Sequence, residues 1–241
     1  MEISRLNASE PLFASSAYKA LVIGANGAIG NAFVDAFHAD TNCTHIELVS
    51  RTGSRFDLLD PESISAQARS SSERGPFEII MDATGALEIN GVGPEKSLNS
   101  LNADHLMQAF CINAIGPAMV LRHFSPLLAK GASVYAKLSA RVGSISDNKT
   151  GGWYGYRASK AALNMMLQNA AIELQRKNTN LRLVALQPGT VRSKLSQPFV
   201  SSQNHLLEPH VAVHGMLNAL KNLPTKSGAY FMDYKGHEIP W

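Results

Sequence analysis

Residues 20–30 read ALVIGANGAIG and decide the fold predicted for this 241-residue chain. The stretch begins with a short apolar run that is typical of a buried strand, and Gly24 ends that run. From Ala28 onward the apolar residues recur at helical spacing. A strand, a glycine-rich turn and a helix in this order predict the first half of a βαβ unit.

The glycine spacing inside this turn indicates a nucleotide site. Gly24 permits a tight turn, Gly27 lets the backbone approach a pyrophosphate, and Gly30 allows the helix to pack closely on the sheet. The N-terminus of the following helix offers free N–H groups to phosphate. A glycine-rich turn without a ligand is the alternative, but the βαβ context favours nucleotide binding. Asn26 and Ile29, in the same turn, are predicted to contact the cofactor.

The alternation of strands and helices continues along the chain. Strands are predicted over 45–49, 77–81, 132–138, 181–187 and 228–232, and helices over 102–128, 154–177 and 208–220, with a further helix opening at Asp60. This pattern predicts an α/β fold, a single-domain Rossmann-type doubly wound parallel sheet of about seven strands with helices on both faces. We expect that domain over 18–241, a lead-in over 1–17 and a substrate loop over 193–208.

Composition narrows the classes of function. The chain is 45% hydrophobic and 17% charged, which excludes wholesale disorder, and its net charge of +3 is not gathered into a run of like charges. We therefore expect no nucleic-acid partner. No apolar run reaches the roughly 18–20 residues of a membrane-spanning helix, and residues 1–16 lack a secretory pattern, so a cytoplasmic protein is expected. The histidines show no metal-binding spacing, so no metal site is predicted.

The choice of cofactor depends on the end of the second predicted strand. About twenty residues after Gly30, where an acidic residue would hold the ribose hydroxyls of NAD, the chain reads Ser50-Arg51. A hydroxyl and a guanidinium can hold a 2′-phosphate, whereas a carboxylate would repel it. The nearest acid, Glu47, lies inside the strand. NADP(H) is therefore preferred and NAD(H) is possible; Arg55 competes with Arg51 for the same role.

Tyr156 and Lys160 form a second candidate group. They are four residues apart and hence lie on one face of a helix. A nearby ammonium favours the phenolate, so Lys160 is expected to lower the pKa of Tyr156 toward the range in which a phenol transfers protons. Such a pair can protonate a carbonyl oxygen as hydride arrives. A surface pair at a common helical spacing is the alternative, which the upstream glycine turn disfavours.

These motifs together resemble the short-chain dehydrogenase/reductase family over nearly the whole chain. They occur in the family's order, from the glycine turn through Asp57-Leu58 and Asn113 to Tyr156/Lys160 and Pro188-Gly189. The stretches over 151–164, 187–191 and 236–241 are more specifically similar to the C-factor (C-signal) branch. The resemblance implies that Tyr156 is the acid/base and that Lys160 also binds the hydroxyls of the nicotinamide ribose.

The resemblance also implies the remaining cofactor contacts. Asp57 would meet the adenine amino group with Leu58 beside it, and the strand-end motif Asp82-Ala83-Thr84-Gly85 stands where family members usually carry Asn-Asn-Ala-Gly. The nicotinamide carboxamide would be held by the residues Pro188, Gly189, Thr190 and Val191.

Asn113 is a candidate on separate grounds. Pro117, four residues later, has no N–H to give to the Asn113 carbonyl, so the helix is expected to bend there. The resemblance implies that Asn113 holds a water linked to Lys160. A proline kink that only helps the helix to pack is the alternative.

One departure from the family pattern concerns catalysis directly. The family's substrate-orienting serine is normally the second of a Ser-Ser pair, and here that pair reads Ser139-Ala140. We predict Ser139 in this role, with Ser144 as an alternative. Because neighbouring residues of a strand point to opposite faces, the one-residue offset matters.

The leading hypothesis is an NADP-preferring oxidoreductase that transfers hydride between a nicotinamide and a small-molecule carbonyl or alcohol substrate. The alternative is a cofactor-binding signalling or sensor protein of C-factor type with vestigial catalysis, which the missing serine motivates. A nucleotide-sugar epimerase is disfavoured, because such chains usually carry a larger C-terminal substrate domain. The resemblance suggests a homodimer or homotetramer formed through the two long helices.

Overall fold

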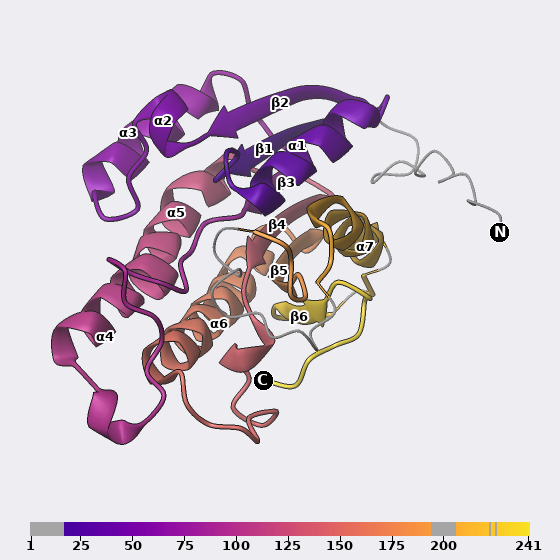
Figure 1. Cartoon of the computed structure of the whole chain (residues 1–241). Coiled ribbons are helices and arrows are strands. Elements are labelled where there is room, and N and C mark those ends of the chain that lie inside the picture. The colour runs from indigo at the N-terminus through magenta and orange to yellow at the C-terminus, as the bar shows by residue number, and fades with distance from the viewer. Residues whose placement is uncertain (1–16, 194–205, 222, 225) are drawn as a thin grey trace, which may run out of the picture.

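The computed structural model describes residues 17–193, 206–221, 223–224 and 226–241, and within them six strands form one parallel sheet (Figure 1). The strands are β1 (Tyr18–Ile23), β2 (Cys43–Val49), β3 (Ile79–Asp82), β4 (Ser133–Leu138), β5 (Leu181–Gln187) and β6 (Tyr230–Asp233). The α-helices are α1 (Ala28–Ala39), α2 (Arg51–Ser54), α3 (Pro61–Ser72), α4 (Ala103–Phe110), α5 (Gly116–Phe124), α6 (Tyr154–Gln175) and α7 (Pro209–Lys221).

The predicted fold class is confirmed. The sheet has the order β2-β1-β3-β4-β5-β6, and every neighbouring pair is parallel. The described sheet has six strands where about seven were expected, and all six lie where the sequence predicted strands. The predicted lead-in and nearly all of the predicted substrate loop lie outside the described residues, so these two assignments remain predictions.

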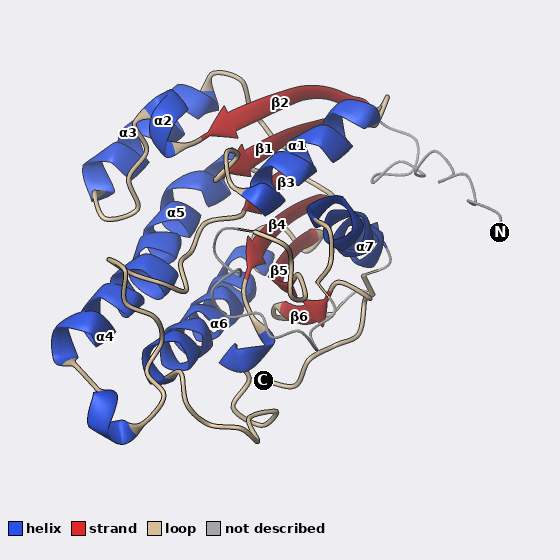
Figure 2. Ribbon diagram, in the orientation of Figure 1, coloured by secondary structure: helices blue, strands red, loops and turns tan. Residues whose placement is uncertain are grey.

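Helices cover both faces of the sheet, as Figure 2 shows. Helices α1 and α7 pack over one face, where Ala20, Val22 and Met81 belong to the same buried cluster as Phe33 and Met216. Helices α3, α5 and α6 cover the other face, against strand residues such as Leu21, Ile80 and Tyr135. The strands are apolar toward both faces because both are buried, as expected of a parallel sheet.

The strand order reverses between β1 and β3, and this reversal positions the site. Successive connections from β1 run outward to β2 and then back across to β3, so the chain leaves β1 and β3 in opposite directions. In open α/β sheets ligands bind at such a point, beyond the carboxyl ends of the strands. The glycine turn after β1 and the Asp82–Gly85 segment after β3 both lie at this edge.

The helix predicted over 102–128 is not one regular α-helix. Helix α4 ends at Phe110, a π-helical turn spans Cys111–Ile115, and α5 begins at Gly116. The N–H of Gly116 donates to the Cys111 carbonyl, five residues back, which is the π-helical spacing. The irregularity predicted from Pro117 is therefore present, as a widened turn around Asn113.

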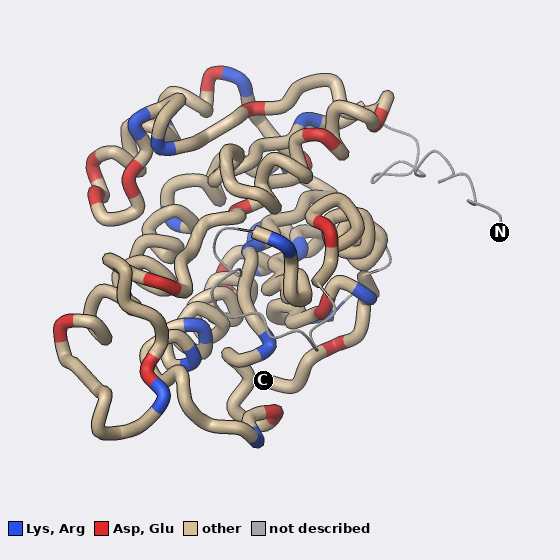
Figure 3. The backbone as a smooth tube through the Cα atoms, in the orientation of Figure 1, with Lys and Arg blue, Asp and Glu red and all other residues tan. Residues whose placement is uncertain are grey.

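The charged residues are interspersed in sign over the described chain in the view of Figure 3. None of the helices in the described part of the chain combines the length and the apolar character needed to cross a membrane.

Candidate active site

The glycine turn has the geometry that its sequence predicts. Gly24 has a φ of +83°, and its N–H donates to the Val49 carbonyl over 2.8 Å, which ties the turn to the end of β2. A Cβ on Gly30 would lie 2.1 Å from the Gly24 carbonyl oxygen, so only glycine lets α1 start so close to the turn. Gly27 is the N-cap of α1.

The N-terminus of α1 offers hydrogen-bond donors to an anion. No side chain caps it, and its first turn contains no acidic residue. The Gly27 N–H turns back to the Gly24 carbonyl at 3.0 Å, which leaves the following N–H groups directed outward from the helix end. Free N–H groups and the positive end of the helix dipole suit a phosphate.

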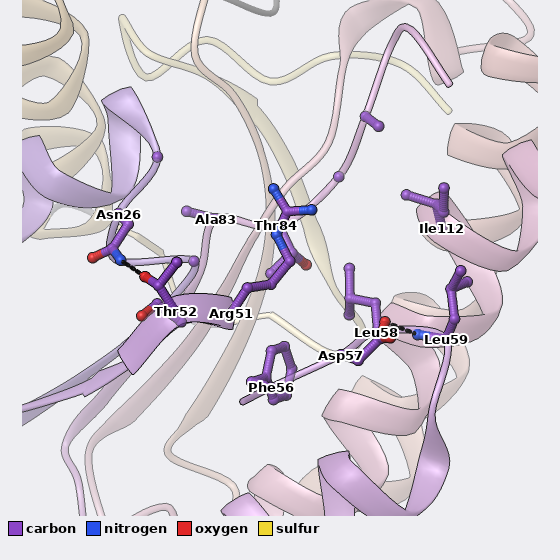
Figure 4. A pocket seen from close by; sticks show the side chains of 15 residues that line it. Asn26, Arg51, Thr52, Phe56, Asp57, Leu58, Leu59, Ala83, Thr84 and Ile112 are labelled. Atoms are coloured by element: carbon purple, nitrogen blue, oxygen red, sulfur yellow. Dashed lines mark hydrogen bonds between the residues drawn. The ribbon is translucent and has the colours of Figure 1, made fainter. Parts of the chain in front are cut away.

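A cavity of about 420 Å³ opens beside this turn. Figure 4 shows its wall, with Arg51 extending from the end of β2 between Asn26 on one side and Asp57 on the other. Ser50 caps the short helix α2 by accepting from the Gly53 N–H at 3.2 Å. The Asn26 amide donates to the hydroxyl of Thr52 over 2.6 Å, which links the glycine turn to α2.

Glu47, the acid nearest to Ser50 in the sequence, is already paired. Glu47 is buried in β2, and the Arg74 guanidinium binds both of its carboxylate oxygens, at 2.6 and 2.7 Å. No described residue forms an ion pair with Arg51. The cavity therefore has an available cation next to Ser50, and its lining includes one carboxylate, that of Asp57.

Asp57 and Leu58 line the same cavity. The Asp57 carboxylate accepts from the Leu59 N–H at 2.9 Å, and the backbone N–H of Asp57 donates to the Ser63 hydroxyl at 2.7 Å. These bonds hold the turn before α3 in place. The Leu58 carbonyl presses against the start of α5, where a Cβ on Gly116 would be only 2.6 Å away. Both predicted residues thus border the space expected for a base.

The opposite wall consists of Ala83, Thr84, Gly85 and Ala86. Asn113 holds the end of this segment in two bonds, with its Oδ1 accepting from the Ala86 N–H at 3.0 Å and its Nδ2 donating to the Ala86 carbonyl at 2.8 Å. The buried Asn113 side chain is placed by the π-helical turn. Asn113 therefore supports the cavity wall.

Tyr156 and Lys160 lie next to this wall on the first turns of α6. The Lys160 ammonium is 5.7 Å from the centre of the Tyr156 ring and donates to the Leu138 carbonyl at 3.2 Å. A Cβ on Gly85 would be 3.3 Å from Lys160 Nζ and 3.1 Å from Asn113 Oδ1. The pair is therefore contiguous with the cavity at Gly85, where a side chain would be in tight contact with Lys160 and Asn113 and where the φ of +139° favours glycine.

The electrostatics of the pair differ from the prediction. Burial raises the pKa of Tyr156 to about 12, where the sequence predicted a lowering by Lys160. Burial also lowers the pKa of Lys160 to about 7, helped by the nearby cation of Lys137 and opposed by Asp82. Desolvation disfavours the charged form of both groups. Lys160 is therefore only partly protonated near neutral pH, so it cannot stabilise a phenolate strongly.

Ser139, predicted to orient a substrate, forms a hydrogen bond within the protein, and its role remains a prediction. Its hydroxyl donates to Asn164 Oδ1 at 2.7 Å, and the residue is 5% exposed. Alternation along the strand turns Ala140 the other way. Ser144, the alternative, is also buried and donates to the Pro240 carbonyl at 2.5 Å.

The last predicted group, Pro188 to Val191, lies at the carboxyl end of β5, on the same edge of the sheet. Gly189 has a φ of +80°, and the Thr190 carbonyl accepts from the Leu207 N–H at 2.9 Å. Among the described residues, none of these four lines the 420 Å³ cavity. They follow β5, which neighbours β4 in the sheet, and their predicted contact with a nicotinamide remains a prediction.

Comparison with known proteins identifies the family. A family model described as short chain dehydrogenase matches residues 47–204. The chain belongs to the short-chain dehydrogenase family. It is 31% identical over 186 residues to 1-hydroxy-2-glutathionyl-2-methyl-3-butene dehydrogenase of Rhodococcus sp., which covers 77% of this chain and 78% of the relative. The predicted family is therefore confirmed, and this short-chain dehydrogenase is an oxidoreductase by family.

The predicted branch is confirmed as well. The chain is 32% identical over 168 residues to C-signal of Myxococcus xanthus, a match that covers 69% of this short-chain dehydrogenase and 94% of C-signal.

Solved structures of other short-chain dehydrogenases share the fold. An NADPH-bound carbonyl reductase from chicken fatty liver matches with a TM-score of 0.81 and 23% identity, over 98% of this chain and 97% of that one. A Burkholderia multivorans short-chain dehydrogenase/reductase with bound NADP matches with a TM-score of 0.76 and 23% identity, over 93% and 100%.

Two features of this short-chain dehydrogenase were missed from the sequence. Lys137 is buried in β4 and pairs with Asp82 at the end of β3. A lysine within the apolar stretch SVYAKL was the available signal, but its partner lies 55 residues away. Glu95 is also buried, and its Oε2 accepts from the Gly155 N–H at 2.9 Å, which steadies the start of α6. No pattern in the sequence marked Glu95.

Proposed function

We propose that this oxidoreductase reduces a small-molecule carbonyl compound with NADPH, with Tyr156 as the proton donor. The observation that carries the proposal is the contact at Gly85. There the cavity lies next to Lys160 Nζ and Asn113 Oδ1, and Lys160 Nζ is 5.7 Å from the centre of the Tyr156 ring. One ligand that fills the cavity can therefore reach the pair.

The residues of the cavity fit NADP(H). The uncapped start of α1 suits the pyrophosphate, and Arg51 with Ser50 suits a 2′-phosphate on the adenosine ribose. Asp57 and Leu58 would border the adenine, and Lys160 would hold the nicotinamide ribose. The NADP- and NADPH-bound proteins of the same fold support this choice.

The reaction needs a hydride and a proton. NADPH, held by the residues of the cavity, would supply the hydride for the carbonyl carbon. The Tyr156 hydroxyl donates its proton to the carbonyl oxygen, so that an alcohol forms. With a pKa of about 12, the phenol is protonated across the neutral range and suits donation better than abstraction. Lys160, with a pKa of about 7, can return a proton to Tyr156 near neutral pH.

The experiment is NADPH oxidation with a panel of ketones and aldehydes, comparing wild type with Tyr156→Phe. We expect kcat/KM to fall by about 100-fold to 10,000-fold, the usual contribution of a general acid. Tyr154→Phe, two residues earlier on the same helix, is the matched control and should retain activity. The Kd of NADPH should change little in either variant. Equal activity in wild type and Tyr156→Phe would refute the proposal.

A second candidate is an NADP(H)-binding sensor of the C-signal branch with vestigial catalysis. It is favoured by one observation, that Ser139 and Ser144 both donate their hydroxyl protons to other groups of the protein, Asn164 and the Pro240 carbonyl. Tight NADPH binding by wild type, with no turnover of any carbonyl compound in the panel, would favour this candidate over the reductase.

The oligomer proposed from the sequence uses the surface of the two long helical segments. Met107 on α4 and Met165 on α6 are both more than half exposed, and α4 packs beside α6. A homodimer or homotetramer would cover these side chains. Sedimentation of wild type against a Met107→Glu/Met165→Glu variant tests this, and an unchanged sedimentation coefficient would argue against it.

A further inference from the structure

Lys137 is a buried lysine that the reaction proposed above does not use. Its side chain is 1% exposed, and the Asp82 side chain beside it is fully buried. The two residues are register partners at the carboxyl ends of β3 and β4. Lys137 Nζ donates to Asp82 Oδ1 at 2.9 Å, to the Thr84 carbonyl at 2.6 Å and to the Thr84 hydroxyl at 2.8 Å. All three hydrogens of the ammonium are thus engaged.

These bonds converge on the cavity wall. Asp82 Oδ1 also accepts from the Thr84 N–H at 2.9 Å and from the Thr84 hydroxyl at 2.6 Å. Thr84 is thereby held at its N–H, its carbonyl and its side chain, while Asn113 holds Ala86 at the other end of the turn. A buried ion pair contributes little net stability compared with apolar packing, so stability alone does not account for this one.

The turn between these two anchors runs directly past the catalytic lysine. Gly85 approaches Lys160 Nζ so closely that an added Cβ would be 3.3 Å from it. Lys160 Nζ in turn donates to the carbonyl of Leu138, the residue that follows Lys137. Any shift of the turn would change both the shape of the cavity and the surroundings of Lys160.

We propose that Lys137 is a positioning residue for the reductase reaction, holding the Thr84–Ala86 turn against Lys160 and the cofactor cavity without touching the substrate. This inference rests on the proposed function for its effect on turnover. Its structural content, the influence of Lys137 on Lys160, can be measured without any substrate.

The charge of Lys137 also affects the pKa of Lys160. The ionisable groups that face Lys160 are Lys137 from β4, Asp82 from β3 and Tyr156 from its own helix. The cation of Lys137 lowers the pKa of Lys160 more than the carboxylate of Asp82 raises it. Replacing both charges by neutral groups should therefore raise the pKa of Lys160.

The test is the double variant Asp82→Asn/Lys137→Gln, which keeps hydrogen-bonding groups and removes both charges. Lys160 is titrated by NMR of ¹³Cε-labelled lysine, without added NADPH, with Lys160→Arg to assign the signal. We expect the Lys160 midpoint to move to higher pH than in wild type. We also expect kcat/KM with NADPH and a carbonyl substrate to fall, by up to about 100-fold for a displaced reacting group.

Two further variants separate the two effects. Thr84→Val removes the hydroxyl that Lys137 binds but no charge, so it should lower kcat/KM and leave the Lys160 midpoint in place. Tyr135→Phe removes only the 3.4 Å bond from the tyrosine hydroxyl to Asp82 Oδ2 and is the matched control from the same cluster. It should leave both readouts unchanged.

The outcomes are distinct. A folded double variant with an unmoved Lys160 midpoint and wild-type kcat/KM would overturn the inference and leave Lys137 as a core ion pair only. If the double variant does not fold, an unaltered kcat/KM in Thr84→Val would overturn it instead. A wild type without turnover would refute the proposed function, while a shifted Lys160 midpoint would still support the coupling of the two lysines.

Discussion

The two walls of the site are built in different ways. The wall around β1, α1 and β2 consists of backbone and exposed side chains, namely the turn from Gly24 to Gly30 and Arg51. The wall after β3 consists of Ala83 to Ala86, and buried ionisable groups lie behind it, namely Asp82, Lys137 and Lys160. The first wall suits a ligand whose phosphates need N–H groups and a cation. The second suits proton transfer, because burial moves the pKa values of its groups.

This difference gives the two walls different weaknesses. Backbone contacts fail when a side chain intrudes, whereas buried charges fail when a partner is lost. The predictions that follow test each wall by its own weakness, from the largest expected effect to the smallest.

The largest effect is expected at the buried pair. Lys137→Met leaves the Asp82 carboxylate buried without its cation, which should lower the free energy of unfolding by about 3–5 kcal/mol. Asp82→Asn/Lys137→Met removes both charges and should recover a large part of that loss. Urea unfolding of the single and double variants measures the difference. A double variant no more stable than Lys137→Met would show that charge is not what makes this wall fragile.

The glycine turn should be next in size. Gly30→Ala puts a Cβ 2.1 Å from the Gly24 carbonyl oxygen, so α1 must move, at a cost of about 1–3 kcal/mol typical of overpacking. NADPH binding should weaken with it, as measured by nucleotide fluorescence. Gly27→Ala, whose Cβ would be 3.3 Å from the same oxygen, is the matched comparison and should cost less stability. The reverse order would mean that close packing does not explain the turn.

Removing the cation at the edge of the first wall should have a moderate effect. Arg51→Ala should reduce the ratio of kcat/KM for NADPH to that for NADH by about 10-fold, or about 1.4 kcal/mol, because one charge-assisted contact to the 2′-phosphate is lost. Arg55→Ala is the control, since Arg55 does not line the cavity. If Arg55→Ala changes the ratio and Arg51→Ala does not, the roles of the two arginines are exchanged.

The smallest effect is a pH dependence from the second wall. The pKa of Lys160 is about 7 in the folded protein, against an ordinary value of 10.5. Between these values the unfolded chain binds more protons, so the free energy of unfolding rises with pH. From pH 7 to pH 8 Lys160 should contribute a rise of about 1 kcal/mol. Lys160→Met should remove this part of the slope; a slope identical to that of wild type would contradict the lowered pKa.

The sequence predicted the glycine turn and the Ser50-Arg51 pair of the first wall, because these features depend on short-range spacing. Three glycines at fixed offsets and Ser50-Arg51 at the end of the next strand are all visible without a structure. The same holds for the order of strands and helices, which the apolar pattern predicted at all six described strands.

Near the second wall, the sequence predicted which residues form the Tyr156–Lys160 pair but not their electrostatics. Tyr156 and Lys160 were recognised from their helical spacing, but the direction of the Tyr156 pKa shift was not. That direction depends on the burial of the phenol, which is not encoded within a few residues of Tyr156. Ser139 shows the same limit, since the choice between its two possible directions depends on Asn164, 25 residues away.

By itself, then, the sequence determined the fold class, the glycine turn, the cation beside it and the membership of Tyr156 and Lys160 in one group. Each of these follows from local periodicity, because strands, helices and turns are made by residues close together in the chain. Only the tertiary structure decided that Lys137 pairs with Asp82, that Ser139 turns to α6 and that Lys160 titrates near neutral pH. Those properties arise from desolvation and from charges brought together by packing, which no local pattern records.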